Sequence, residues 1–74
     1  MKTQQQIKEY ATIVHLYYLE EILSKKEVSE WMGEYGLDVV KLLKRRIEFT
    51  YFDDWYMTKM TIWKNGKVDI ETEI

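Results

Sequence analysis

The chain has 74 residues, of which 46% are hydrophobic and 32% are charged, and its formal net charge is −2. This length fits a single domain, 1–74, and the apolar content excludes a disordered chain. Cysteine is absent, which excludes disulfides and thiolate zinc sites, while aromatic residues reach 15%. No apolar run approaches the roughly 20 residues that span a bilayer. The N-terminal segment MKTQQQIKEY has no continuous apolar stretch, so we expect a cytoplasmic protein without a membrane partner.

The first predicted element is a helix over residues 4–23, a segment that contains neither proline nor glycine. At helical spacing, one apolar stripe is formed by Ile7, Ala11, Val14, Tyr18 and Ile22. Other apolar residues, among them Leu16 and Leu19, lie on different sides of the same helix. A small chain can hardly cover a helix on several sides, so this surface predicts self-association or a partner.

Two shorter helices are predicted next, over residues 25–35 and 39–46. Ser24 and Glu27 have the spacing of a capping box, in which each side chain accepts a hydrogen bond from a free amide at the start of a helix. Gly36 is a natural stop for the first of these helices. Apolar residues at helical spacing and a run of cations at its end predict the second helix.

From Ile47 onward the apolar residues alternate, which predicts strands. Asp53-Asp54 is the first predicted turn. Asn65-Gly66 is a strong signal for a two-residue turn, which would set Trp63 opposite Val68. The sequence therefore predicts an α+β domain with three N-terminal helices followed by a three-stranded antiparallel β-meander, whose strands cover residues 47–52, 55–64 and 67–73.

Both faces of the predicted sheet carry large apolar side chains, but the helices of so short a chain can cover only one face. The open face is expected to be aromatic, with Asp69, Glu71 and Glu73 along its rim. This surface and the first helix each predict an interface. We therefore expect a homodimer, formed through the first helix or through the open sheet face.

Residues suited to catalysis are scarce. His15 is the single histidine and stands among apolar residues, and the three glycines form no phosphate-binding loop. Asp53-Asp54 is more simply a turn, and Glu20-Glu21 a solvated helix edge. The sequence therefore predicts a protein that is not an enzyme and that binds no metal or cofactor.

A stretch ending at residue 46 is similar to a helix-turn-helix motif, because Ser29 and Gly33 stand four residues apart and a hairpin follows as a wing would. Residues 47–74, however, carry three basic and six acidic residues, and an acidic wing repels phosphates. A winged-helix-like DNA-binding regulator is thus an alternative, although direct nucleic-acid binding is not expected. Its DNA contacts would be Lys41, Lys44, Arg45 and Arg46.

The segment Gln4-Gln5-Gln6-Ile7-Lys8-Glu9-Tyr10 resembles the peptide pattern that binds sliding clamps, Gln-x-x-aliphatic-x-x-aromatic. In that family the glutamine hydrogen-bonds at the rim of a hydrophobic pocket, which the aliphatic and aromatic residues fill. The corresponding residues here are Gln4, Ile7 and Tyr10. Ala11 stands where the family often has a second aromatic residue.

In length, aromatic content and this motif, the chain resembles small phage-encoded inhibitors of the bacterial replication sliding clamp. The resemblance implies a non-enzymatic protein in the bacterial cytoplasm that binds the clamp and blocks polymerase binding and DNA loading or sliding. Tyrosine and tryptophan suit such contacts because they bury a large area at a small entropy cost. The expected partner-binding residues are Gln4, Ile7, Tyr10, Tyr17, Trp55, Tyr56 and Trp63.

Acidic residues of the C-terminal third form a possible DNA-mimic surface, which could lie against the basic inner surface of the clamp. The same surface leads to a second alternative, an anti-defence protein that inhibits a host nuclease. Carboxylates on an edge strand also protect against edge pairing, so the role of this surface stays open. Its members are Asp53, Asp54, Asp69, Glu71 and Glu73.

Overall fold

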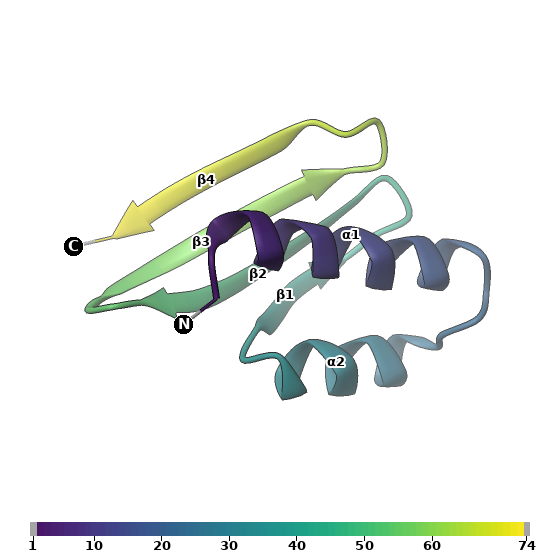
Figure 1. Ribbon diagram of the computed structural model, residues 1–74. Coiled ribbons are helices and arrows are strands. Elements are labelled where there is room, and N and C mark those ends of the chain that lie inside the picture. The colour runs from purple at the N-terminus through teal and green to yellow at the C-terminus, as the bar shows by residue number, and fades with distance from the viewer. Residues whose placement is uncertain (1, 74) are drawn as a thin grey trace.

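A computed structural model describes residues 2–73 and shows two helices followed by a four-stranded antiparallel sheet (Figure 1). The α+β class agrees with the sequence analysis, but the prediction of three helices and a three-stranded meander is wrong. Within residues 2–73, no helix is long and apolar enough to cross a membrane. The elements are α1 (Gln4–Leu19), α2 (Lys25–Glu34), β1 (Asp38–Leu42), β2 (Arg46–Asp53), β3 (Tyr56–Trp63) and β4 (Val68–Glu73).

Helix α1 begins at a capping box that the sequence analysis did not identify. The Thr3 hydroxyl accepts a hydrogen bond from the Gln6 amide, and the Gln6 side chain accepts one from the Thr3 amide. The helix ends at Leu19 rather than at residue 23, because the chain turns at Glu21, whose φ of 62° is left-handed. The predicted helix over residues 4–23 is therefore one turn too long.

Helix α2 agrees closely with the prediction over residues 25–35. Ser24 and Glu27 form the expected capping box. At the other end Gly36 adopts a φ of 84°, and the Leu37 amide donates to the Met32 carbonyl at 2.8 Å. This is the Schellman arrangement, in which a glycine without a Cβ takes the left-handed position that ends the helix.

The predicted helix over residues 39–46 is wrong, because this segment forms β1, the turn after it and the first residue of β2. The β-branched Val39 and Val40 favour a strand, and β1 pairs with β2 along the edge of the sheet. A shift in register between Val39 and Lys41 leaves Val40 exposed. This bulge breaks the alternation of apolar residues, so their spacing in the sequence also fitted a helix.

The turn between β3 and β4 contains three residues, not two. The Gly66 amide donates to the Trp63 carbonyl at 2.9 Å, and the Trp63 amide donates to the Lys67 carbonyl at 2.8 Å. Gly66 has a φ of 94°, as the last position of a three-residue hairpin loop requires. Val68 therefore pairs with Ile62 rather than with Trp63. A shift of one residue turns every side chain of β4 to the opposite face from that predicted.

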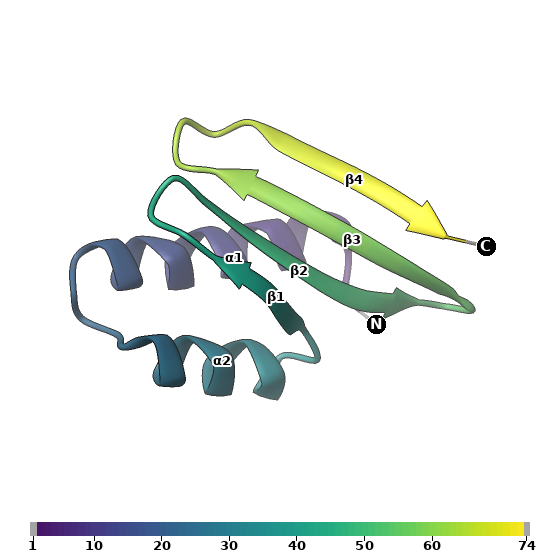
Figure 2. The same cartoon turned by 180° about the vertical axis from the view of Figure 1, so that it is seen from behind.

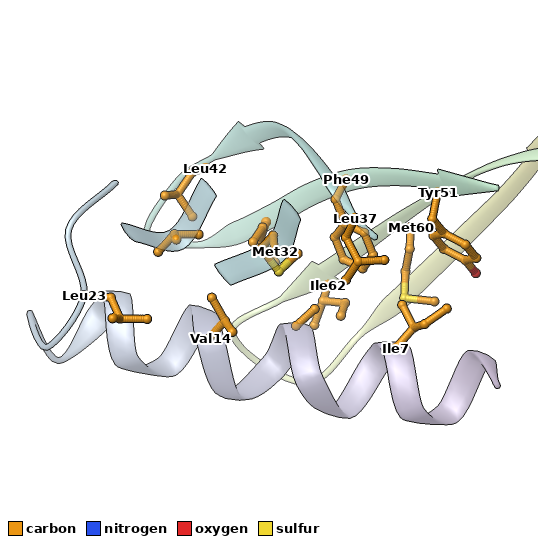
Figure 3. Packing of buried hydrophobic residues seen from close by; sticks show 13 residues of the cluster. Ile7, Val14, Leu23, Met32, Leu37, Leu42, Phe49, Tyr51, Met60 and Ile62 are labelled. Atoms are coloured by element: carbon orange, nitrogen blue, oxygen red, sulfur yellow. The ribbon is translucent and has the colours of Figure 1, made fainter. Parts of the chain in front are cut away.

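Both helices lie on the same face of the sheet, and Figure 2 shows the other face without a covering helix. Helix α1 crosses the middle strands, whereas α2 lies beside β1. Side chains from all these elements meet in one core (Figure 3). Its members are Ile7, Ala11, Val14, Leu23, Val28, Met32, Leu37, Leu42, Ile47, Phe49, Tyr51, Met60 and Ile62.

Charged side chains occupy the centre of the uncovered sheet face. The Arg46 Nε atom lies 2.7 Å from one carboxylate oxygen of Glu48, and the Lys59 Nζ atom lies 3.2 Å from the other. The hydrogen bond from Arg46 lowers the pKa of Glu48; burial opposes this effect and Lys59 adds to it. The charged form of Glu48 is therefore favoured in the folded state.

We expect Glu48→Gln to make the stability of the protein less dependent on pH. Because the pKa of Glu48 is lowered by folding, its contribution is complete above the unfolded pKa of about 4.3 and is lost as the pH falls through the folded pKa. The variant should have a lower urea midpoint than the parent at pH 7, and this difference should shrink at pH 3. Equal pH dependence in the parent and in Glu48→Gln would contradict this assignment.

Candidate functional site: an aromatic tip beside a cleft

The three residues of the clamp-peptide motif are separated by the fold. Gln4 is exposed at the start of α1, whereas Ile7 is 5% exposed and belongs to the core. The Tyr10 ring stacks on Tyr35 at 3.9 Å between centroids, and its hydroxyl donates to the Trp31 carbonyl at 3.0 Å. Ile7 and Tyr10 thus connect α1 to the sheet and to α2, and they are not on a free surface.

Tyr17 also lies in the contact between the two helices, where its ring meets the edge of Trp31 at 6.3 Å. Trp63, another predicted anchor, is half-buried at the end of β3, with the Lys67 Nζ atom 5.0 Å from the centre of its ring. Neither residue offers a free aromatic face comparable with that of Trp55.

The most exposed aromatic side chains gather at the turn between β2 and β3. Trp55 is 92% exposed, Phe52 71% and Tyr56 42%. The turn residues are Asp54 and Trp55, since Asp53 already pairs with Tyr56; the predicted turn at Asp53-Asp54 was one residue early. We call Phe52, Trp55 and Tyr56 the aromatic tip.

The backbone at the tip is held in an unusual conformation. Asp54 has a φ of 57°, a left-handed value that aspartate tolerates better than most residues. A two-residue hairpin turn needs such a conformation, and Trp55, the second turn residue, is 92% exposed. The tip is therefore the end of a regular two-residue hairpin.

A cleft of about 210 Å³ adjoins the tip, where the start of α1, the end of α2 and the end of β2 meet. Tyr35 forms an aromatic wall, with Tyr10 stacked on one of its faces. The Lys2 Nζ atom lies 4.4 Å from the centre of the same ring. The lining residues are Lys2, Gln4, Ile7, Tyr35, Gly36, Leu37, Tyr51, Phe52, Asp53 and Asp54.

Tyr51 brings an unsatisfied polar group to this cleft. Its side chain is 4% exposed, and neither its hydroxyl nor that of its cross-strand neighbour Thr58 has a hydrogen-bond partner within residues 2–73. Burial, and then the charge of Asp53, raise the pKa of Tyr51. Gln4 acts in the opposite direction but forms no hydrogen bond of good geometry with the hydroxyl. A buried hydroxyl in this state costs about 1–3 kcal/mol.

The predicted acidic surface is divided in two. Asp53 and Asp54 lie at the tip, whereas Asp69 and Glu71 lie on the uncovered face of β4, where Glu71 pairs with Lys59. The side chain of Glu73 lies outside the described part of the structure. The acidic residues close to exposed aromatic rings are thus Asp53 and Asp54.

Basic residues gather at the opposite end of the sheet, an arrangement that the sequence analysis missed. The Lys64 amide donates to the Arg45 carbonyl at 2.9 Å, which joins the β1–β2 and β3–β4 turns. Lys44 and Lys67 are exposed in the same two turns. The small net charge therefore conceals a basic end and an acidic, aromatic end.

His15, the only histidine, is buried and structural in its contacts: its Nε2 atom donates to the Leu43 carbonyl at 2.8 Å. No group of three or more potential metal ligands occurs within the described residues.

The chain matches no protein-family model, no curated protein and no solved structure. The geometry of the molecule is therefore the basis for its proposed function.

Proposed function

We propose that the protein is a non-enzymatic inhibitor that binds another protein through the aromatic tip. The observation that supports this most strongly is the exposure of three large aromatic side chains on one short hairpin end. Scattered exposed apolar residues are normal, but tryptophan and tyrosine gathered at one place are typical of the residues that dominate binding energy. Binding would bury these rings and block whatever surface of the partner they cover.

The charges beside the tip favour a protein partner over a membrane. Asp53 and Asp54 flank the aromatic rings, and anionic lipid surfaces repel carboxylates. A protein surface can instead provide apolar pockets for the rings together with cations for the two carboxylates. Such charge complementarity also accelerates association.

The bacterial sliding clamp is our specific proposal for this partner. Because Ile7 lies in the core and Tyr10 between the helices, the motif that suggested the clamp is not available as a contact in the folded chain. In our proposal the aromatic tip, and not the segment from Gln4 to Tyr10, enters the hydrophobic peptide pocket. The alternative of an inhibitor of a host nuclease would use the same end of the molecule.

The sequence also suggested a homodimer and a winged-helix DNA-binding regulator. A homodimer stays a prediction, and Ile13 and Leu16 on α1 are each about half exposed and suited to it. The winged-helix hypothesis needs a recognition helix over residues 39–46, where the chain forms a strand and a turn. We therefore do not propose DNA reading by that element.

We expect Trp55→Ala to weaken partner binding at least tenfold, because truncation of a central aromatic anchor typically costs about 2 kcal/mol or more. The measurement is surface plasmon resonance with purified bacterial sliding clamp, with capture from a bacterial lysate by parent and variant in parallel. Ile22→Ala is the matched control, since Ile22 is also exposed and apolar but lies outside the tip. Binding that is equally strong in parent and Trp55→Ala would rule out the tip as the contact.

A further inference from the structure

The cleft beside the aromatic tip is already arranged around a cation. The ammonium group of Lys2 lies over one face of Tyr35, at a distance typical of a cation–π contact, while Tyr10 covers the other face. Asp53 and Asp54 line the same cleft. Among residues 2–73, neither Lys2 nor any other cation forms an ion pair with Asp53 or Asp54.

The hydroxyl of Tyr51 provides a second, independent indication of a ligand. The Tyr51 residue lines the cleft, and its buried hydroxyl, which the Gln4 side chain approaches without a hydrogen bond of good geometry, has no hydrogen-bond partner in the described part of the chain. Buried polar groups in proteins are nearly always paired, so an orphan group in a cleft indicates a missing partner. A ligand with N–H donors could use the oxygen of this hydroxyl together with the carboxylates.

We propose that this cleft receives the guanidinium group of an arginine side chain from the protein partner, which displaces Lys2 from the face of Tyr35. The identity of the ligand as part of a protein rests on the proposed function above. A guanidinium is planar and can stack on Tyr35, and its five N–H donors can serve Asp53, Asp54 and Tyr51 together. The ammonium of lysine has three donors and no planar surface, and is therefore the poorer ligand.

The first experiment titrates the intact protein with N-acetyl-arginine amide and follows the backbone amides by two-dimensional NMR. The expected result is saturable shifts confined to Gln4, Gly36 and the segment from Tyr51 to Trp55. N-acetyl-citrulline amide, which has nearly the same shape without the charge, should bind at least tenfold more weakly. Equal binding of the two compounds, or shifts spread over Asp69 and Glu71 instead, would overturn the proposal. Equal binding of N-acetyl-lysine amide would also overturn the preference for a guanidinium.

Two substitutions should change the affinity in opposite directions. Tyr51→Phe removes only the hydroxyl and should weaken binding of N-acetyl-arginine amide about tenfold. Lys2→Ala removes the internal competitor and should strengthen binding about threefold. Tyr18→Phe is the matched control, because Tyr18 is half-buried elsewhere on α1 and should leave the affinity unchanged. Unaltered affinity in both Tyr51→Phe and Lys2→Ala would exclude this cleft as the site.

Failure of the arginine-site proposal can be distinguished from failure of the proposed function, because the titration uses no partner protein. If the arginine compound binds the cleft but Trp55→Ala keeps full partner binding, the tip proposal fails while the cleft chemistry stands. If Trp55→Ala abolishes partner binding but the compound does not bind, the tip stands and the arginine site fails.

Discussion

Replacing Phe49 with alanine should cost about 3–5 kcal/mol of unfolding free energy. Phe49 is fully buried on β2, and Figure 3 shows its ring in the centre of the core. Removing it leaves a cavity that two buried neighbours, Leu37 in the α2–β1 connection and Met60 on β3, can close only in part. A domain of this size often has a total stability near 5 kcal/mol, so the variant should keep at most about 2 kcal/mol of unfolding free energy at 25 °C.

Phe52 provides an unusually close control for this experiment. It is the same residue type on the same strand, three positions away, but its side chain faces the uncovered side of the sheet. Phe52→Ala should change the unfolding free energy by less than about 1 kcal/mol. Urea unfolding followed by circular dichroism measures both variants. If the two lost stability equally, the assignment of the faces of β2 would be incorrect, because a slip of one residue exchanges them.

Local signals in the sequence were sufficient for α2 but did not give the end of α1. The capping box at Ser24 and Glu27 and the left-handed Gly36 act within a few residues of the chain, so α2 could be predicted closely. The strands, in contrast, form through pairing with segments that are more distant in the sequence, so local signals did not predict β1 or the register of β4. Val39 and Val40 form a strand because β2 is available beside them and because a bulge adjusts the register.

The turn between β3 and β4 shows how a small local choice changes a whole strand. Asn65-Gly66 indicated the hairpin correctly, but the same dipeptide also fits a three-residue loop with Gly66 in its last position. The longer loop places Val68 and Ile70 on the face of the sheet that the helices cover, where Ile70 pairs with Met60. Val68 packs against the core in this register, whereas Ile70 is still 40% exposed, so the burial of Val68 favours the register that occurs over the one predicted.

The candidate site was predictable only in part, for a related reason. The sequence analysis named Trp55 and Tyr56 as binding residues because the chain is rich in aromatic residues, and both belong to the aromatic tip. It did not name Phe52, the third member. The cleft, in contrast, brings together Lys2 before α1, Tyr35 at the C-cap of α2 and Tyr51 on β2. The spacing of these residues in the sequence does not predict that they lie close together, because their proximity depends on how α1 and α2 pack against the sheet. A clue was present in Tyr51, an inward-facing strand residue that carries a polar group.

Replacing Ile7 with alanine should destabilise the protein by about 2–5 kcal/mol, the range for a large aliphatic residue in a core. Ile7 connects the first turns of α1 to the sheet, and Figure 3 shows it close to Met60. Ile13→Ala is the control, because Ile13 is on the same helix but 50% exposed, and it should cost less than about 1 kcal/mol. Thermal and urea unfolding of the two variants measure this difference. Equal losses would show that α1 does not pack with the face described.

This result also decides how the motif around Ile7 can be tested. A loss of clamp binding in Ile7→Ala or Tyr10→Ala would reflect loss of folded protein, since both side chains make internal contacts. Gln4→Ala changes the exposed glutamine of the motif without removing a core side chain. If the motif is the contact, Gln4→Ala must weaken clamp binding at unchanged stability. If the aromatic tip is the contact, Trp55→Ala should weaken clamp binding at least tenfold, whereas Gln4→Ala, at the edge of the neighbouring cleft, should weaken it less.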